Sequence, residues 1–140
     1  PDRGYFGEKD YQQIAVIKRM VADLGFKLAI IPCPVIREES GLAMSSRNTL
    51  LTDAERAIAA NIYRVMKESR DLNAEVSETH DYVVDNINAI DGLEVQYFSI
   101  VDGDTLEDVS SWKDAESIVG CITVFCGSKP IRLIDHIRYK

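Results

Sequence analysis

The sequence predicts a βαβ fragment of an α/β domain, followed by a small α+β domain of two helices and a roughly three-stranded antiparallel sheet. Three patterns carry this prediction: a strand–helix–strand succession with long apolar runs, two amphipathic helical stretches, and a closing series of strands without a crossover between them. We place the domain boundary near Asn48. Residues 1–48 then form the first domain and residues 49–140 the second.

The first domain begins with a strand that ends at Tyr5 and Phe6 and turns at Gly7. Asp10 follows near a helix N-terminus, where a carboxylate can accept hydrogen bonds from free backbone N–H groups. Gly25 then ends the helix. Residues 27–36 are nearly all apolar, which is typical of a parallel strand covered on both faces. The apolar positions of the helix recur every three or four residues, at Ile14, Ile17, Met20, Val21 and Leu24.

The second domain begins after a loop over residues 37–51, where the periodicity breaks. Thr52 and Glu55 form a capping-box pattern that predicts a helix start. A second amphipathic helix follows the polar stretch 69–77 and ends at Gly92. The predicted buried positions are Ile58, Ile62, Val65 and Met66 on the first helix and Val83, Ile87 and Ile90 on the second.

From Leu93 the apolar period changes to two, which predicts a strand that ends at Asp102 and Gly103. Strict alternation places Leu93, Val95 and Tyr97 on one face and Phe98 and Ile100 on the other. Residues 105–114 are polar and predict an irregular segment or a single helical turn. Residues 118–126 and 131–137 predict an antiparallel hairpin around the turn at 127–130.

The composition excludes several classes of protein. The chain has 16 basic and 23 acidic residues, and its formal charge of −7 disfavours nucleic acid as a partner. No apolar run approaches the roughly 20 residues that span a membrane, and we expect a cytoplasmic location. The odd count of three cysteines suits a reduced compartment. Cys121 and Cys126 are predicted to point to opposite faces of a strand, so we expect no shared metal ion. The histidines, His80 and His136, are expected to be solvated or packed.

Two clusters could carry chemistry. Residues 7–10, Gly-Glu-Lys-Asp, combine a close backbone approach, a cation and a helix N-terminus, which are the ingredients of a phosphate site. Residues 45–47 offer two hydroxyl groups and a guanidinium suited to phosphate. Either cluster, taken alone, is also compatible with an ordinary surface turn. Both follow strands of one βαβ fragment, and such sheets bind ligands beyond the carboxyl ends of their strands.

Three stretches, residues 5–13, 37–48 and 131–137, resemble the pantothenate synthetase (pantoate–beta-alanine ligase) family, and specifically the second half of its members. The resemblance implies that the first domain is a remnant of a Rossmann-like nucleotidyltransferase domain and that the second is a lid over the active site. It also implies a homodimer. The family's His-x-Gly-His motif is not found in this sequence, so we expect an incomplete active site and an inactive isolated chain.

The resemblance also implies roles for individual residues. Gly7 and Asp10 meet the ribose of ATP, Lys9 meets its phosphates, and Gln13 binds pantoate. Lys9 and Arg47 act as the catalytic cations. The expected ATP-binding set is Gly7, Glu8, Lys9, Asp10, Ile36, Met44, Ser45, Ser46 and Arg47, with Ile36 and Met44 beside the adenine.

The implied reaction condenses pantoate and beta-alanine with Mg²⁺ and ATP through a pantoyl-adenylate, releasing pyrophosphate and AMP. It needs no protein nucleophile, only positioning and charge stabilisation. Phosphates and water hold Mg²⁺ in such enzymes, so no protein ligand to the metal is expected. Two alternatives remain open: a non-catalytic module that folds and associates within a parent enzyme, and another adenylate-forming nucleotidyltransferase that uses a different acid.

Overall fold

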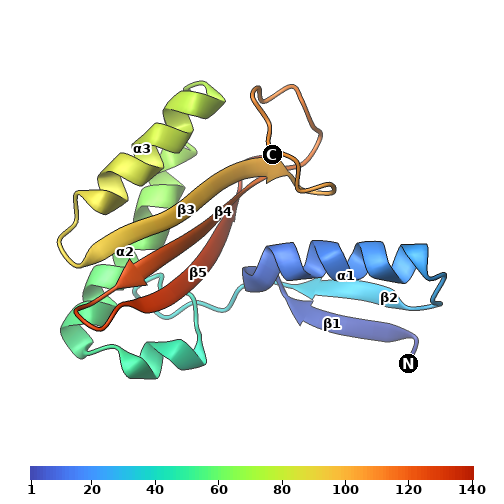
Figure 1. Ribbon diagram of the computed structural model, residues 1–140, viewed down its shortest axis with the longest axis horizontal. Coiled ribbons are helices and arrows are strands. Elements are labelled where there is room, and N and C mark those ends of the chain that lie inside the picture. Colours follow the sequence, from blue (N-terminus) through green and yellow to red (C-terminus); the bar gives the residue numbers. More distant parts are fainter.

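The computed structural model describes all 140 residues and contains two structural units (Figure 1). The first unit, here called the arm, consists of two parallel strands and one helix: β1 Arg3–Gly7, α1 Tyr11–Asp23 and β2 Ala29–Cys33. The second unit is an antiparallel sheet in the order β3-β4-β5, with two helices on one face: α2 Asp53–Ser69, α3 Val76–Asn88, β3 Leu93–Asp102, β4 Ile118–Cys126 and β5 Ile131–Arg138. The predicted order of elements is therefore present.

The arm has the parallel pairing that its strand–helix–strand pattern predicted. Tyr5 lies opposite Ile31 in the register of β1 and β2, and α1 runs along the strand pair (Figure 1). A one-turn 3-10 helix, η1 Glu8–Asp10, joins β1 to α1. The left-handed backbone of Gly25, with φ +65°, ends the helical region as predicted. Because β1 ends at Gly7 and η1 follows directly, Lys9 lies just beyond the carboxyl end of β1.

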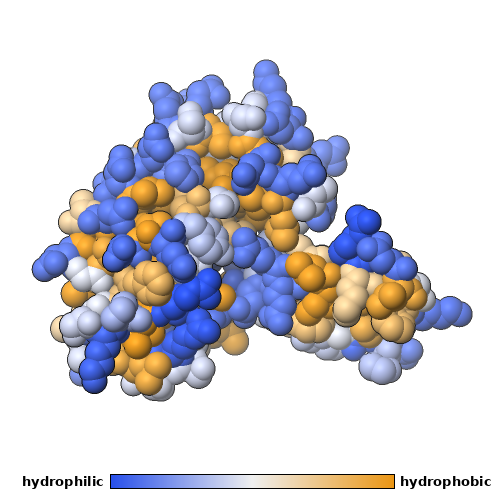
Figure 2. All heavy atoms as spheres, in the orientation of Figure 1, coloured by the Kyte–Doolittle hydropathy of each residue, from blue (hydrophilic) through white to orange (hydrophobic).

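Several details of the arm differ from the prediction. Asp10 occupies the N-cap position of α1, but its side chain makes no capping hydrogen bond, because the residue ends η1 and lacks the extended backbone of a typical N-cap. β2 is shorter than the predicted strand over 27–36, because its ladder with β1 spans only the pairs from Arg3–Ala29 to Gly7–Cys33. The strand pair is only partly buried rather than covered on both faces. Met20 and Leu24 are 47% and 61% exposed, and Figure 2 shows apolar residues at the arm's surface.

The second unit is organised by α2, whose start was predicted correctly. The Thr52 hydroxyl accepts a hydrogen bond from the Glu55 N–H at 3.2 Å, and the Glu55 carboxylate accepts one from the Thr52 N–H at 2.9 Å. This capping box is confirmed. Most of the predicted stripe positions are buried, namely Ile62, Val65 and Met66 on α2 and Val83 and Ile87 on α3, whereas Ile58 and Ile90 are half-buried.

β3 departs from strict alternation. A register shift directly after Val95 leaves Gln96 as an extra residue, which is a β-bulge. Because of the bulge, Phe98 and Ile100 turn into the same core that Leu93 joins. The prediction that these residues lie on opposite faces was therefore wrong, since a period of two holds only within each half of the strand.

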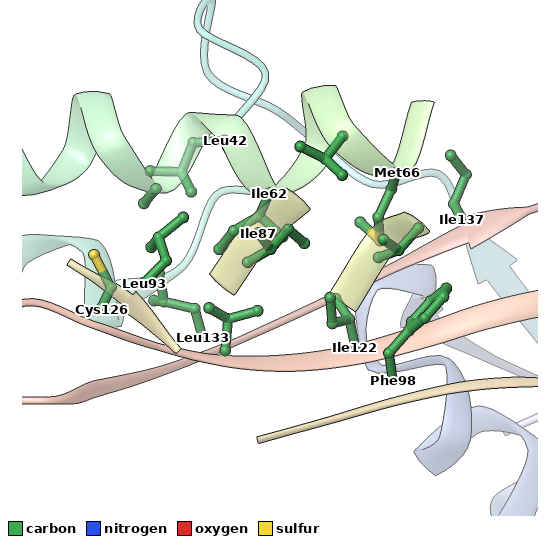
Figure 3. Close-up of a cluster of buried hydrophobic side chains, with 14 of the residues drawn as sticks. Leu42, Ile62, Met66, Ile87, Leu93, Phe98, Ile122, Cys126, Leu133 and Ile137 are labelled. Atoms are coloured by element: carbon green, nitrogen blue, oxygen red, sulfur yellow. The ribbon is translucent and has the colours of Figure 1, made fainter. Parts of the chain in front are cut away.

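One large hydrophobic core lies between the sheet and its two helices, as Figure 3 shows. Cys126 belongs to this core, whereas Cys121 belongs to a small cluster on the opposite face of the sheet. The predicted opposite orientation of the two cysteines is confirmed. Burial raises the pKa of the Cys121 thiol to about 11. The labelled residues of the core are Leu42, Ile62, Met66, Ile87, Leu93, Phe98, Ile122, Cys126, Leu133 and Ile137.

The segment between the units packs on the second one. Arg37 and Ala43 form an isolated antiparallel bridge, and a second 3-10 helix, η2 Ser46–Leu50, precedes α2. Leu42 and Leu51 both join the main core. The domain boundary near residue 48 stays a prediction. Of the two predicted alternatives for residues 105–114, the irregular one is present, and β4 and β5 form the predicted antiparallel hairpin. None of the three α-helices has the length and apolar character needed to cross a membrane.

Candidate active site

The two predicted phosphate-binding clusters lie together. Lys9, from η1, and Ser45 and Arg47, from the segment before α2, line one narrow cavity of about 20 Å³. The contact between η1 and β5 produces this proximity, because β5 is an edge strand of the second unit and faces the arm. The structure thus brings together residues that are far apart in sequence, as the ligand-binding hypothesis requires.

A second cavity, of about 170 Å³, adjoins the first. Lys9 lines both cavities, and Asp10 and Gln13 line only the second. The Tyr97 hydroxyl donates a hydrogen bond at 3.0 Å to the side-chain oxygen of Gln12, so β3 is tied to α1 at this wall. Gln13, in the first turn of α1, therefore adds an amide group to the cavity that Lys9 also lines.

Ile36 and Met44, the predicted adenine neighbours, lie side by side. The Met44 N–H donates to the Ile36 carbonyl oxygen at 2.9 Å, and Met44 is 54% exposed and Ile36 71% exposed. Large exposed apolar side chains at one place offer a surface on which a flat base could pack. Both lie outside the two cavities.

Three other predicted residues do not line these two cavities. Gly7 ends β1, and Ser46 is exposed at the start of η2. Glu8 lines a separate cavity of about 250 Å³ together with Tyr11 and Arg138. In this structure the Glu8 side chain therefore lies apart from Lys9 and Arg47.

The segment that carries Ser45 and Arg47 is fixed by a buried ion pair that sequence reasoning missed. The Arg37 guanidinium donates to both carboxylate oxygens of Asp135, at 2.7 and 2.9 Å. Arg37 also donates to the Gly41 carbonyl oxygen at 3.1 Å and stacks on the Tyr63 ring, 3.6 Å from its centroid. Because the two side chains are only 18% and 6% exposed, the pair is a strong positional constraint.

Asn48 provides a second anchor for the same segment. Its side-chain amide donates to the Ala43 carbonyl oxygen and to the Glu38 carboxylate, each at 3.1 Å. Arg56 of α2 also donates to Glu38 at 2.7 Å, and this bond is the main cause that lowers the pKa of Glu38. The loop over residues 37–51 is thus bonded to α2 through Glu38 and Arg56.

Arg132 is the other functional candidate that sequence reasoning missed. It lines both cavities, and its backbone carbonyl oxygen accepts a hydrogen bond from the Arg47 guanidinium at 3.1 Å. One signal was available in the sequence. Alternation along β5 puts Arg132 on the same face as His136, which stacks on Tyr11 of the arm with ring centroids 5.3 Å apart.

The two histidines are packed residues, as expected. His136 is 6% exposed, and its burial lowers its pKa. His80 stacks on Phe98 and has its Nε2 atom 2.9 Å from the Phe98 carbonyl oxygen. No group of three or more His, Cys, Asp or Glu side chains is arranged to hold a metal ion.

Comparisons with known proteins identify the family of this chain. The family model described as pantoate-beta-alanine ligase matches residues 1–138. The pantothenate synthetase of Bacteroides thetaiotaomicron is 54% identical over 142 residues, covering 100% of this chain and 50% of the relative. That of Porphyromonas gingivalis is 51% identical, with the same coverage. The chain therefore spans about half the length of these curated relatives.

Solved structures give the same result. The crystal structure of pantothenate synthetase from Thermus thermophilus matches 99% of this chain and 50% of its own, with a TM-score of 0.89 and 36% identity. The pantoate-beta-alanine ligase from Francisella tularensis, complexed with beta-gamma ATP and beta-alanine, matches 99% of this chain and 44% of its own, with a TM-score of 0.70 and 30% identity. On this evidence the chain belongs to the pantoate-beta-alanine ligase family.

Proposed function

We propose that this chain supplies part of the active site for the ATP-dependent condensation of pantoate and beta-alanine to pantothenate. The observation that carries the proposal is the convergence of Lys9, Ser45 and Arg47 on one cavity that adjoins a second cavity lined by Gln13. A phosphate-binding corner next to an amide that can bind a hydroxy acid suits a reaction between those two groups. The Francisella ligase in complex with beta-gamma ATP and beta-alanine supports ATP and beta-alanine as substrates.

The roles we propose follow these positions. Lys9 and Arg47 bind the phosphate chain and stabilise charge that develops on it, and Ser45 and Ser46 donate hydroxyl hydrogen bonds to the same group. Gln13 binds pantoate. The remaining members of the proposed ATP site are Gly7 and Asp10 at the ribose, Ile36 and Met44 at the adenine, and Glu8, whose side chain lines a separate cavity in this structure.

The proposed chemistry has two steps. The pantoate carboxylate attacks the α-phosphorus of ATP, a P–O bond forms, and pyrophosphate leaves with the electron pair of the broken bond. The beta-alanine amine then attacks the carbonyl carbon of the adenylate and an amide bond forms. The C–O bond to the phosphate breaks, AMP leaves with its electron pair, and the nitrogen loses a proton to solvent. The residues of this chain hold the reactants in line and stabilise anionic oxygens. Neither step requires a nucleophilic side chain, and burial raises the pKa of both Cys121 and Cys126.

Mg²⁺ fits this scheme only as an ion bound to the phosphates of ATP. The carboxylates at the cavity walls are Asp10 and Asp135, and Asp135 is already bonded to Arg37 through both of its oxygens. The residues of this chain therefore do not form a ligand set for the ion. We assign no protein ligand and no step to the metal.

The test is a product analysis of the ligase of full family length that contains this chain. With ATP and pantoate but without beta-alanine, we expect one equivalent of pyrophosphate per site. Adding beta-alanine should then release AMP and pantothenate. Formation of ADP and phosphate instead would exclude the adenylate route, and turnover with another acid but not with pantoate would identify a different adenylate-forming enzyme. The homodimeric state, the cytoplasmic location and the inactivity of the isolated chain remain predictions.

A further inference from the structure

Three cations at the candidate site have no carboxylate partner. Lys9, Arg47 and Arg132 line the same cavity, and none of them has an acidic oxygen within 4.0 Å, although the chain as a whole carries a formal charge of −7. The nearby Asp135 is neutralised by its ion pair with Arg37. Unpaired like charges repel one another, so their presence at one cavity favours a bound anion.

The Arg132 side chain is oriented by a neutral group. Its Nε–H donates a hydrogen bond at 3.0 Å to the side-chain oxygen of Gln96, the extra residue of the bulge in β3. Bulges often re-aim a side chain near an active site. Because the acceptor is an amide and not a carboxylate, it holds the guanidinium in place and leaves its full positive charge available.

Most hydrogen-bond donors of the Arg132 side chain have no partner in the structure. A guanidinium has five N–H donors, and only the Nε–H of Arg132 has a partner in the structure. The two Nη groups can therefore form the bidentate fork that arginine makes with phosphate oxygens. The Arg132 carbonyl oxygen also accepts from Arg47, so one residue places two cations at the cavity.

We propose that Arg132 is a third phosphate-binding residue of this site, oriented by Gln96, and that it binds the polyphosphate chain of the nucleotide. This inference rests on the proposed function and extends it by a residue outside the two predicted phosphate-binding clusters, residues 7–10 and 45–47. Arg132 lies on the wall shared by the two cavities, between Arg47 and Gln13. A guanidinium there can hold the departing pyrophosphate while the acid occupies the neighbouring cavity.

The experiment measures pyrophosphate binding by titration calorimetry, in the ligase of full family length. Arg132→Gln should weaken pyrophosphate binding about tenfold, because it removes a charge-assisted bond and keeps the backbone carbonyl that receives Arg47. Gln96→Glu should weaken binding by a similar factor, since a carboxylate neutralises the guanidinium that it orients. Arg64→Gln is the control, because it removes the same charge from an exposed ion pair on α2. This control should bind like the wild type.

The outcomes separate this inference from the proposed function. Unchanged pyrophosphate affinity in Arg132→Gln, or equal losses in Arg132→Gln and Arg64→Gln, would overturn the role of Arg132. The same conclusion follows if the wild type does not bind pyrophosphate. A loss of pantoate affinity with intact pyrophosphate affinity would reassign Arg132 to the acid. If Arg132→Gln binds pyrophosphate more weakly as expected, but the wild-type protein makes no pantothenate, the proposed function is wrong and the anion site remains supported.

Discussion

The buried ion pair between Arg37 and Asp135 allows a quantitative prediction about stability. Asp135 is 7% exposed and accepts three hydrogen bonds, two from Arg37 and one from the His136 N–H at 2.8 Å. The substitution Asp135→Asn keeps the size of the side chain but removes its charge. Arg37 would then be a largely buried cation without a counterion.

The expected cost is large, because breaking a buried pair from one side typically destabilises a protein by about 3 kcal/mol or more. Urea unfolding of a chain of this size has a slope of about 2 kcal/mol per molar, so the midpoint should fall by about 1.5 M. The matched control is Glu68→Gln, which breaks the Arg64–Glu68 pair, whose side chains are 53% and 45% exposed. Exposed pairs of this kind contribute less than about 0.5 kcal/mol, which corresponds to a shift below about 0.25 M.

Trp112 provides the assay. It is the single tryptophan of the chain, it belongs to the second unit, and its indole N–H donates to the Ala74 carbonyl oxygen at 2.8 Å. Its fluorescence therefore reports unfolding of the unit that contains Asp135. A midpoint for Asp135→Asn as close to the wild type as that of Glu68→Gln would refute the reasoning that this pair is structurally important.

Three further predictions concern single residues. Lys9→Ala should slow pyrophosphate release about a hundredfold in the full-length ligase, because one preorganised charge is lost, and a wild-type rate would remove Lys9 from the mechanism. Gln13→Ala should weaken pantoate more than ATP in calorimetry, and the reverse order would reassign the residue. Burial lowers the pKa of His136, so the unfolded state binds more protons below about pH 6.5, and stability should fall as the pH drops through that window. His136→Gln should flatten this dependence in urea unfolding, and an equal flattening in His80→Gln would contradict the assignment.

Much of the fold could be predicted from the sequence because its signals are local. The capping box at Thr52 and Glu55 needs only four consecutive residues, and the left-handed backbone of Gly25 follows from one residue type. The bulge at Gln96 could not be predicted in this way. A bulge is defined by how β3 pairs with β4. The change of apolar phase between Val95 and Phe98 does not by itself distinguish a bulge from a straight strand with apolar residues on both faces.

In the candidate site, too, residues with a local sequence signal could be predicted and residues that depend on long-range contacts could not. Lys9 and Arg47 were found because each belongs to a short stretch whose residue types suit phosphate. Arg37 and Asp135 were missed because they are 98 residues apart in sequence and meet only when β5 lies beside the loop that follows β2. Arg132 was missed for a related reason, since its neighbour Gln96 lies on another strand.

The loop that carries Ser45 is hydrogen-bonded to β5 at both of its ends. Arg37 bonds to the Asp135 side chain at one end, and Arg47 bonds to the Arg132 carbonyl oxygen at the other. The same edge strand thus sets the position of the proposed phosphate-binding loop and contributes Arg132. We therefore expect a substitution at Asp135 to change both the stability of the protein and its affinity for the nucleotide. Asp135 would affect the nucleotide through the loop that Arg37 holds, and not by direct contact. In the full-length ligase, Asp135→Asn should raise the KM for ATP more than it changes the KM for beta-alanine, and an equal effect on both would show that the loop is held in place without the ion pair.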